Sequence, residues 1–345
     1  MEDLKLALLG FGNAGQAFAK LLMNKTDEIE KAYGRNVIVT AIATNTKGNL
    51  IGSNGIDLSR ILDDLEKTGK FRCEDYLTEM TTVEIVKNAD YDVLMEMTPL
   101  NIKTGQPAIS HIEEAIRGGK HIVTANKGPI AWDFGRLRKM ADEAGVCFFY
   151  ETTVMDGAPV FNLVEKTLMM NEVTEVSGIL NTTTNFILEE MAKGTDYEEI
   201  MAQGRKMGFI EADPAMDIEG YDAAAKITAL LNVLMDAGIT PDKVIRKGIE
   251  DITVDNIRDA ASRGKVIKLL CIGKRDEKGG VYAAVEPVEI DTGDFLATVN
   301  STTSDLSITT DLMKKITVTE HEPEIEQTAY GIFGDVLRVM QFEKA

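Results

Sequence analysis

Near the start of the chain lies the segment Leu4-Lys-Leu-Ala-Leu-Leu-Gly10-Phe-Gly12-Asn13-Ala14-Gly15, from which the class of fold can be predicted. Its first half is an apolar run typical of a buried strand, and a helical pattern follows the last glycine, over residues 16–22. The glycines have the spacing G-x-G-x-x-G between a strand and a helix, which is the fingerprint of a dinucleotide-binding turn. The sequence therefore predicts that a βαβ unit begins here.

Each glycine of this turn has a separate physical role. Gly10 permits the tight turn, Gly12 lets the backbone approach a pyrophosphate, and Gly15 lets the helix pack against the strand. The helix N-terminus adds free N–H groups and partial positive charge, which attract phosphate. The residues expected to bind the phosphates are Gly10, Gly12, Asn13, Ala14 and Gly15. A strand–helix turn that holds no ligand is the alternative.

The end of the second expected strand bears on the choice of cofactor. This strand, Val37–Ala43, is followed by Thr44-Asn45-Thr46-Lys47. An NAD-preferring site places Asp or Glu here to accept hydrogen bonds from the ribose hydroxyls, whereas a cation and hydroxyl groups suit a 2′-phosphate. We therefore expect NADP to be preferred over NAD, with Lys47 beside the phosphate. An ordinary loop lysine is the alternative reading of Lys47.

Strands and helices alternate through the first 150 residues. After a loop and helices near 58–68 and 83–87, strands are expected at 91–97, 121–125 and 147–150, with helices at 105–117 and 130–144. This alternation predicts an α/β dinucleotide-binding (Rossmann) domain, residues 1–150, with a doubly wound parallel sheet. Ligands of such sheets bind beyond the carboxyl ends of the strands. Further cofactor residues are therefore expected at those ends: Thr98, Pro99, Asn126 and Lys127.

The pattern changes after residue 150. A turn at 151–159 opens a helix to about 168, and helices are expected near 196–206 and 221–236. Strands cluster at 173–181, 266–274, 281–290 and 317–319 instead of alternating with helices. This predicts an α+β substrate-binding and dimerisation domain over residues 151–320. An amphipathic helix at 324–342, within a last segment 321–345, is expected to pack back on the first domain.

The most chemically loaded stretch is an acidic loop that leads into an apolar helix. Five carboxylates lie between residues 211 and 222, and Pro214 and two glycines predict irregular backbone there. The helix from Ala223 to Met235 is apolar nearly all round, so we expect it to be buried. Asp222 and Lys226 share one face of it, and a buried ammonium is costly unless it is paired. Either they form a catalytic pair, or they stabilise the helix by about 0.2–0.5 kcal/mol.

The composition excludes several classes of protein. The 345 residues allow two domains, and no run of 18 apolar residues is present to span a membrane. A net charge of −19 argues against nucleic acid or an anionic membrane surface as partner. The three cysteines, Cys73, Cys147 and Cys271, have the spacing of neither a zinc site nor a disulfide framework. No signal peptide is expected, and a cytoplasmic location fits.

Four motifs together resemble the homoserine dehydrogenase family, and the resemblance runs from end to end. The glycine turn looks like the nucleotide loop of that family, and residues 123–128 (VTANKG) look like its "TANK" element. Residues 178–188 (GILNTTTNFIL) are similar to its "GxLNGTTNYIL" element, with Thr182 where Gly is common. Residues 208–226 resemble the signature of the family, the most specific of the four.

The resemblance implies a reaction and a set of site residues. The family reduces L-aspartate 4-semialdehyde to L-homoserine with NADPH or NADH, on the route from aspartate to threonine, methionine and isoleucine. Lys226 and Asp222 then form the catalytic pair, with Lys226 as general acid and base. Glu211 and Asp217 bind the substrate, and Lys127 lies beside substrate and nicotinamide. A monofunctional homodimer, without an aspartokinase domain or a C-terminal regulatory domain, is implied.

A sodium ion is the last expectation. Backbone carbonyls of the 151–159 turn can hold a monovalent cation, and four positions match the sodium site of the family: Glu151, Val154, Asp156 and Ala158. Other functions also remain open. Another amino-acid oxidoreductase, such as aspartate-semialdehyde dehydrogenase, needs a thiol nucleophile, and no cysteine here has a motif around it. A catalytically inactive nucleotide sensor on the same fold is the alternative outside enzymes.

Overall fold

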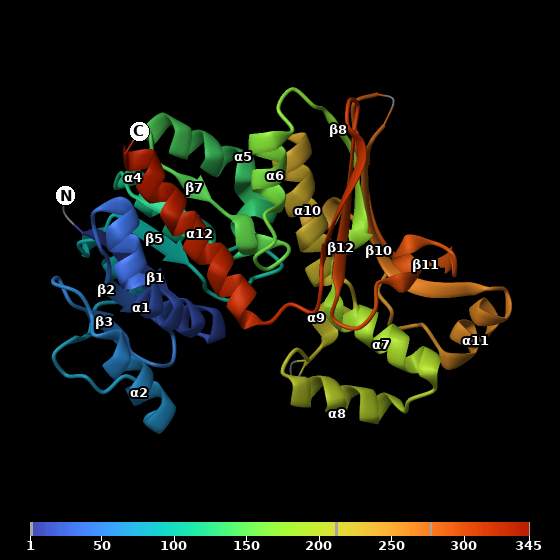
Figure 1. Cartoon of the computed structure of the whole chain (residues 1–345), viewed down its shortest axis with the longest axis horizontal. Helices are drawn as coiled ribbons and strands as arrows, with labels where there is room; N and C mark the ends of the chain where they lie inside the picture. Colours follow the sequence, from blue (N-terminus) through green and yellow to red (C-terminus); the bar gives the residue numbers. More distant parts are fainter. Residues whose placement is uncertain (1–2, 211–212, 277, 345) are drawn as a thin grey trace. The chain divides into compact units, whose positions relative to one another are not determined.

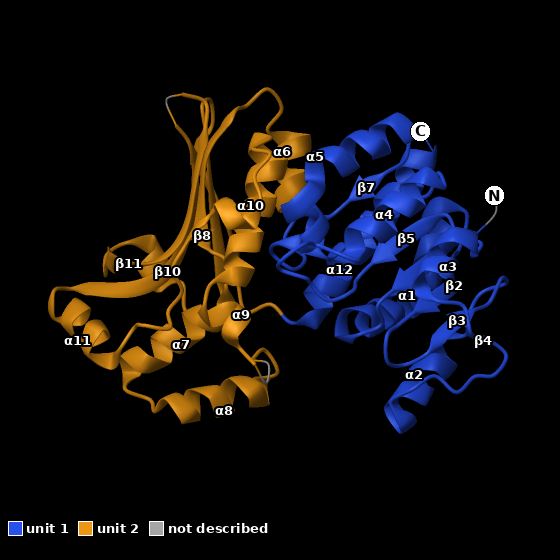
Figure 2. Cartoon of the chain, turned by 180° about the vertical axis from the view of Figure 1, so that it is seen from behind, with its two compact units in different colours: residues 1–159, 324–345 blue, residues 160–323 orange. Residues whose placement is uncertain are grey.

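The computed structural model describes residues 3–210, 213–276 and 278–344. The chain divides into two compact units, which Figure 2 colours separately. Unit 1 comprises Met1–Pro159 and Glu324–Ala345, and unit 2 comprises Val160–Pro323. The sequence predicted boundaries at 150 and 320, whereas the divisions fall after Pro159 and Pro323, nine and three residues later, and the C-terminal segment belongs to unit 1.

Unit 1 is built on a seven-stranded sheet with the order β4-β3-β2-β1-β5-β6-β7. The strands that pair in parallel are β1 (Leu4–Leu9), β2 (Val37–Ala43), β5 (Val93–Glu96), β6 (His121–Thr124) and β7 (Phe148–Phe149). Their order confirms the predicted doubly wound arrangement. The winding reverses between β1 and β5, which is where sheets of this kind bind their ligands.

One edge of this sheet differs from the expectation of purely parallel pairing. The segment after β2 was expected to be a loop, but it forms β3 (Asn49–Ile51), which pairs antiparallel with β2, and β4 (Leu77–Thr78) follows antiparallel beside it. The chain reverses at Gly48, whose φ of 102° is a conformation that glycine adopts readily and other residues rarely do. The backbone N–H of Thr44 donates to Asn49 Oδ1 across the turn. Strands this short carry no readable periodicity.

The helices of unit 1 confirm the predicted alternation (Figure 1). They are α1 (Asn13–Tyr33), α2 (Leu58–Thr68), α3 (Thr82–Asn88), α4 (Ala108–Arg117) and α5 (Lys127–Ala144). Helix α5 begins three residues before the expected start at 130, because Asn126 caps it by accepting a hydrogen bond from the N–H of Gly128.

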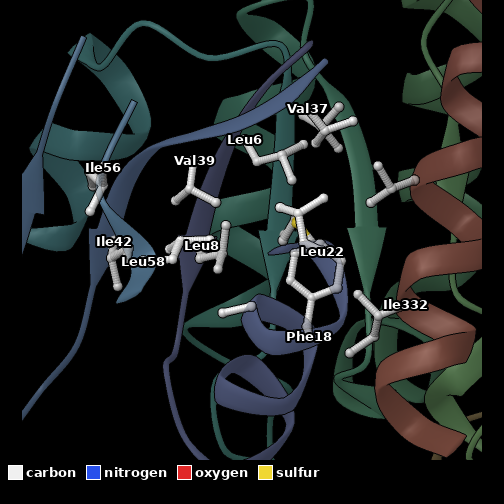
Figure 3. Close-up of a cluster of buried hydrophobic side chains, with 14 of the residues drawn as sticks. Leu6, Leu8, Phe18, Leu22, Val37, Val39, Ile42, Ile56, Leu58 and Ile332 are labelled. Carbon is white, nitrogen blue, oxygen red and sulfur yellow. The ribbon is translucent and has the colours of Figure 1, made fainter. Parts of the chain in front are cut away.

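The core of unit 1 explains why the C-terminal helix α12 (Ile325–Lys344) belongs there. Strand β1 buries its leucines completely, and they face Phe18 and Leu22 of α1. Figure 3 shows Ile332 of α12 close to these two side chains. The predicted return of the last helix to the first domain is therefore confirmed. Because this helix completes the core, we expect unit 1 to depend on it for stability.

Unit 2 carries a six-stranded mixed sheet with the order β13-β12-β8-β10-β11-β9. The strands are β8 (Val173–Ile179), β9 (Ile245–Arg246), β10 (Lys265–Arg275), β11 (Val281–Asp291), β12 (Ser304–Thr310) and β13 (Lys314–Glu320). All pair antiparallel except β9 with β11. The α+β expectation is confirmed, but strand β12, which lies between β13 and β8, was not predicted. Its sequence, SDLSITT, is too polar to be recognised as a buried strand.

The helices of unit 2 are α6 (Val160–Thr167), α7 (Thr182–Lys193), α8 (Tyr197–Met207), α9 (Ala215–Ile218), α10 (Tyr221–Met235) and α11 (Val254–Ser262). Helix α10 is buried along most of its length, as its apolar sequence predicted. Helix α9 is a single turn inside the stretch that was expected to be irregular. Among the residues that the structure describes, no helix combines the length and apolarity needed to cross a membrane.

Candidate active site

The glycine turn of unit 1 has the geometry that its spacing predicted. Gly10 has φ +91°, and a Cβ there would lie 2.5 Å from the carbonyl oxygen of Met97. A Cβ on Gly15 would lie 3.1 Å from the carbonyl oxygen of Gly10. Gly12 differs, because nothing lies within 4 Å of its Cβ position. Gly10 and Gly15 are thus required by the fold, whereas Gly12 leaves space open above the N-terminus of α1.

A cavity of about 700 Å³ opens beside this turn. It lies at the carboxyl ends of β1, β2 and β5, so it is at the point where the winding reverses. Of the expected cofactor residues, those that line it are Gly10, Gly12, Lys47, Thr98 and Pro99. Asn13, Ala14 and Gly15 form the first turn of α1. The open space above Gly12 and the free helix N-terminus fit a dinucleotide diphosphate.

Lys47 reaches from the end of β2 onto the glycine turn. Its Nζ donates to the carbonyl oxygen of Phe11 at 3.0 Å. The β2 end of the cavity is otherwise lined by Ala43 and the polar residues Thr44, Asn45 and Thr46, none of which is acidic. An ammonium group therefore lies where the cofactor phosphates are expected, and no carboxylate stands beside it on this segment.

A buried carboxylate that was not predicted from the sequence connects two other strand ends. Glu96, the last residue of β5, is 0% exposed. Its Oε1 accepts the N–H of Thr98 at 2.8 Å, and its Oε2 lies 2.8 Å from Nδ1 of His111. Asn126 Nδ2 donates in turn to the carbonyl oxygen of Thr98 at 2.9 Å. Glu96 could have been found from the sequence as an acidic residue at the end of an apolar strand. In sheets of this kind the strand ends form the ligand site.

Lys127 is half-buried and begins α5, next to the Asn126 cap. It stands at the carboxyl end of β6, so it occupies the strand-end position that was expected of it. The sequence expectations for unit 1 are therefore brought together at one edge of the sheet, at the ends of β1, β2, β5 and β6.

Unit 2 holds the expected lysine–acid pair on α10. Lys226 Nζ lies 3.5 Å from Asp222 Oδ2, and their side chains are 18% and 16% exposed. Nζ also donates to the carbonyl oxygen of Leu180 at 2.8 Å. The ammonium is thus partly desolvated, with a carboxylate and a carbonyl oxygen beside it. Such an environment fixes the direction of its N–H bonds.

Asn181 connects this pair to a second carboxylate. Its Nδ2 donates to Asp217 Oδ1 at 2.6 Å and to Asp222 Oδ2 at 3.1 Å. Its Oδ1 accepts the N–H of Thr184 at 2.9 Å and so caps helix α7. Asn181 lies within the motif at residues 178–188, but no role was predicted for it. The structure makes it the link between Asp217, Asp222 and the start of α7.

The electrostatics of Asp217 reflect this crowding. Burial raises the pKa of Asp217, and the neighbouring Asp222 carboxylate raises it further. The hydrogen bond from Asn181, the Lys226 charge and the hydroxyl of Thr183 act in the opposite direction and lower the pKa. Burial and the neighbouring negative charge make the ionised form of Asp217 unfavourable. A cationic group that binds beside it would relieve this cost. Glu211, the other expected substrate residue, lies outside the described residues.

The turn expected to bind sodium is tightly constrained. The backbone N–H of Glu151 donates to Asp335 Oδ2 of α12 at 3.0 Å, and Asp156 Oδ1 accepts a hydrogen bond from the hydroxyl of Thr328 at 2.7 Å. Val154 is buried, and Ala158 donates its N–H back to the carbonyl oxygen of Met155 at 2.8 Å. In the described part of the chain, no group of three or more His, Cys, Asp or Glu side chains is arranged to hold a metal. A cation bound mainly by carbonyl oxygens stays a prediction.

The three thiols are poorly suited to nucleophilic chemistry. Cys73, Cys147 and Cys271 are all buried. Burial raises the pKa of Cys147 and of Cys271 to about 12 each. The thiolate is the reactive form, so these two side chains are inert near neutral pH.

Comparison with known proteins gives a consistent result. The family model described as homoserine dehydrogenase matches residues 159–337, and the model of the NAD-binding domain of homoserine dehydrogenase matches residues 10–151. A homoserine dehydrogenase of Methanocaldococcus jannaschii is 37% identical over 99% of this chain and 100% of its own length. An NAD(+)-dependent homoserine dehydrogenase of Pseudomonas canavaninivorans is 31% identical over 99% and 97%.

Solved structures agree with the sequence comparisons. The crystal structure of a putative homoserine dehydrogenase from Archaeoglobus fulgidus superposes with a TM-score of 0.86. It is 33% identical and covers 98% of this chain and 99% of its own. A hyperthermophilic archaeal homoserine dehydrogenase in complex with NADPH shares the fold, with a TM-score of 0.82 at 24% identity, covering 99% and 98% of the two chains.

Proposed function

This chain belongs to the homoserine dehydrogenase family, and on that premise we propose that Lys226 exchanges the proton in the reaction. The enzyme is an NAD(P)-dependent oxidoreductase that interconverts L-aspartate 4-semialdehyde and L-homoserine in amino-acid biosynthesis. The observation that carries the proposal is the partly buried Lys226 ammonium, 3.5 Å from Asp222 Oδ2 and hydrogen-bonded to the carbonyl oxygen of Leu180.

The chemistry divides between cofactor and protein. The reduced nicotinamide supplies the hydride to the aldehyde carbon. Lys226 donates a proton from Nζ to the aldehyde oxygen as negative charge develops there, and in the reverse direction Nζ takes the proton from the hydroxyl group. Asp222 balances the charge of the ammonium and, with the Leu180 carbonyl, orients it. General acid catalysis of this kind contributes about 10²–10⁴-fold in rate.

The substrate is an amino acid, so the site must also bind an ammonium and a carboxylate. Asp217, whose pKa is raised by burial and by Asp222, gains a counterion when the substrate ammonium arrives. In this proposal Asp217 and Glu211 hold the ammonium group, and Lys127 meets the opposite charge. Asn181 is the residue that keeps Asp217 and Asp222 apart while bonding to both.

The test of Lys226 is a methionine substitution, which preserves length and removes the charge. Lys226→Met is expected to lower kcat for NADP-dependent homoserine oxidation, followed at 340 nm, by about 10²–10⁴-fold. Cofactor affinity should stay close to that of the unchanged enzyme, whereas the thermal midpoint should fall with the protein still folded at the assay temperature, because Asp222 and the Leu180 carbonyl oxygen lose the ammonium beside them. The matched control is Lys243→Met, because the Lys243 side chain is 69% exposed and belongs to the same unit. Turnover by Lys226→Met near that of the control refutes the proton-exchange role.

The preference for NADP over NAD rests on Lys47. Its Nζ lies on the glycine turn and no acid replaces it on the Thr44–Lys47 segment. Relatives include both an NAD(+)-dependent enzyme and one in complex with NADPH, so the family alone does not decide the choice. Lys47→Asp is expected to lower the ratio of kcat/KM for NADP to that for NAD by at least about tenfold, since a 2′-phosphate would then face a carboxylate. If the ratio of the two kcat/KM values is unchanged, Lys47 does not recognise the 2′-phosphate.

Sodium at the turn of Glu151, Val154, Asp156 and Ala158 is the remaining part of the site proposal. The tight packing against α12 supports a rigid ring of carbonyl oxygens, which is what a monovalent cation requires. Replacing sodium by tetramethylammonium at constant ionic strength should lower activity or the thermal midpoint. If both stay constant, the turn is structural and holds no ion.

Two other functions are disfavoured by specific observations. A thiol-dependent aldehyde dehydrogenase needs a reactive cysteine, whereas all three thiols are buried. Iodoacetamide should therefore leave the activity of the folded enzyme largely intact. An inactive nucleotide sensor has no need of the Lys226–Asp222 pair, and measurable homoserine oxidation by the unchanged chain excludes it. A cytoplasmic homodimer completes the proposal.

A further inference from the structure

One histidine of the cofactor cavity has a nitrogen that the fold leaves open toward a ligand. His111 belongs to α4, is 6% exposed and lines the cavity of about 700 Å³. Its Nδ1 lies 2.8 Å from Glu96 Oε2. Within the described residues, its Nε2 has no hydrogen-bond partner. Nε2 is not one of the fully enclosed side-chain atoms that lack a partner, so it is accessible, and a ligand group in the cavity can bond to it.

Glu96 decides which proton the imidazole carries. Its Oε1 already accepts the N–H and the hydroxyl of Thr98, and its Oε2 faces His111. A carboxylate only accepts, so Nδ1 of His111 must be the donor to it. In the neutral ring Nε2 is then an acceptor. A ligand group that bonds to Nε2 of His111 must therefore be a hydrogen-bond donor.

The lining of the cavity bears on which part of the cofactor lies near His111. The same cavity is lined by residues 44–47 at the end of β2, the position that holds the adenosine ribose in this fold. The base attached to that ribose is adenine. Its exocyclic amino group is a hydrogen-bond donor, whereas its ring nitrogens are acceptors. This amino group is the match for an accepting Nε2.

We propose that His111 binds the cofactor by accepting a hydrogen bond at Nε2 from the exocyclic amino group of adenine, and that Glu96 is the positioning residue that keeps Nε2 an acceptor. The inference rests on the proposed function, since it requires the cavity to hold a nicotinamide dinucleotide. It gives the site selectivity for adenine, which is independent of the 2′-phosphate and of the nicotinamide.

The test compares NADP with its hypoxanthine analogue, in which a carbonyl oxygen replaces the exocyclic amino group. Dissociation constants are measured by calorimetry at pH 8 with the full chain, without turnover. The unchanged enzyme should bind NADP about tenfold more tightly than the analogue, as the loss of one buried hydrogen bond implies. His111→Phe should bring the two constants to within about twofold of each other. His121→Phe is the matched control, since His121 lies in unit 1 but does not line the cavity, and it should keep the preference.

The Glu96→Gln substitution tests whether Glu96 sets the proton position on the His111 ring or only stabilises the fold. The Gln amide donates to Nδ1, which moves the ring proton to Nε2 and makes that atom a donor. The preference should then reverse toward the hypoxanthine carbonyl, an outcome that a loosened fold does not produce. Equal affinity of the unchanged enzyme for both cofactors, or equal weakening of both by His111→Phe in a folded protein, overturns the inference and leaves the proposed function standing. Failure of the unchanged enzyme to bind either cofactor overturns both.

Discussion

At the scale of single residues, the site of unit 2 depends on one asparagine that serves three partners. Asn181 caps α7 with its carbonyl oxygen and donates from its amide nitrogen to Asp217 and Asp222. Without that donor, two carboxylates would face each other beside one lysine. The charge balance of the site is therefore set by a neutral side chain as much as by Lys226.

Asp217 leads to a prediction about pH and stability. Its folded-state pKa is raised, so the folded protein binds its proton more tightly than the unfolded chain does. The resulting cost to folding is absent below the ordinary pKa of 3.8, grows as pH rises, and is complete above the raised folded-state pKa. Asp217→Asn should therefore raise the thermal midpoint at pH 7, with no gain below about pH 3.8, while the KM for homoserine increases.

The control for this experiment is Asp255→Asn, because the Asp255 side chain is 93% exposed. It should change neither the midpoint at pH 7 nor the KM appreciably. A lower midpoint for Asp217→Asn at pH 7 would mean that its hydrogen bonds outweigh the cost of burying the charge.

The glycine turn gives a matched pair of substitutions. Gly12→Ala places its Cβ where no atom lies within 4 Å, so the protein should fold normally and lose at least about tenfold in NADP affinity as the methyl group obstructs the phosphates. Gly10→Ala must adopt φ +91° with its Cβ 2.5 Å from Met97 O, so it should destabilise folding by about 1–3 kcal/mol. Chemical denaturation and calorimetry measure the two effects. Equal stability losses in both variants would contradict these roles.

The sequence was sufficient to single out residues whose expected role follows from their type and spacing, and those roles stay predictions. The glycines, Lys47, Asp222 and Lys226 stand out because a G-x-G-x-x-G turn or a lysine on an apolar helix is readable locally. Asn181, Glu96 and His111 were missed because their roles depend on partners far along the chain. Glu96 and His111 are fifteen residues apart and meet only when α4 packs on β5.

At the scale of secondary-structure elements, α12 is the part of unit 1 that the chain adds last. Its buried side chains include Ile332, which is 0% exposed. Ile332→Ala should lower the free energy of unfolding by about 2–5 kcal/mol through the cavity that it leaves. Tyr330→Ala on the same helix is the control, since Tyr330 is 62% exposed and its loss should cost less than about 0.5 kcal/mol. Similar losses in the two variants would place α12 outside the core.

The elements that the sequence predicted are those with a strong period or a long apolar run. Helix α10 and strand β1 are examples, since both are buried and apolar. Strands β3 and β4 are three and two residues long, and β12 buries polar residues, among them Asp305, which is 0% exposed. A pattern of apolar residues cannot reveal a buried strand that contains polar side chains. Asp305 Oδ2 accepts a hydrogen bond from the Thr319 hydroxyl at 2.9 Å, whereas Oδ1 is buried without a partner among the described residues.

At the scale of the whole molecule, the net charge of −19 opposes the binding of an anionic cofactor. The cofactor cavity counters this locally, with the N-terminus of α1 and the Lys47 ammonium on its glycine turn. The alternation of strands and helices predicted this architecture, because it is a property of the whole first half of the chain. The oligomeric state could not be predicted in this way, because no motif in the sequence of a single chain encodes it.

The homodimer is the prediction that belongs to this scale. Light scattering after size exclusion should give twice the mass of the 37.8 kDa chain at micromolar concentration. We expect this mass because the resemblance to the homoserine dehydrogenase family implies a dimer that forms through the second domain. A mass of one chain over the same concentration range would contradict it.

Whether Lys226 delivers and accepts the proton can be decided by a crystal structure of the complex with NADP and L-homoserine. We expect Nζ of Lys226 within about 3 Å of the homoserine hydroxyl oxygen, with Asp222 still beside it. A complex in which another group contacts that oxygen, and Nζ of Lys226 lies beyond the reach of a hydrogen bond or one bridging water, would contradict it.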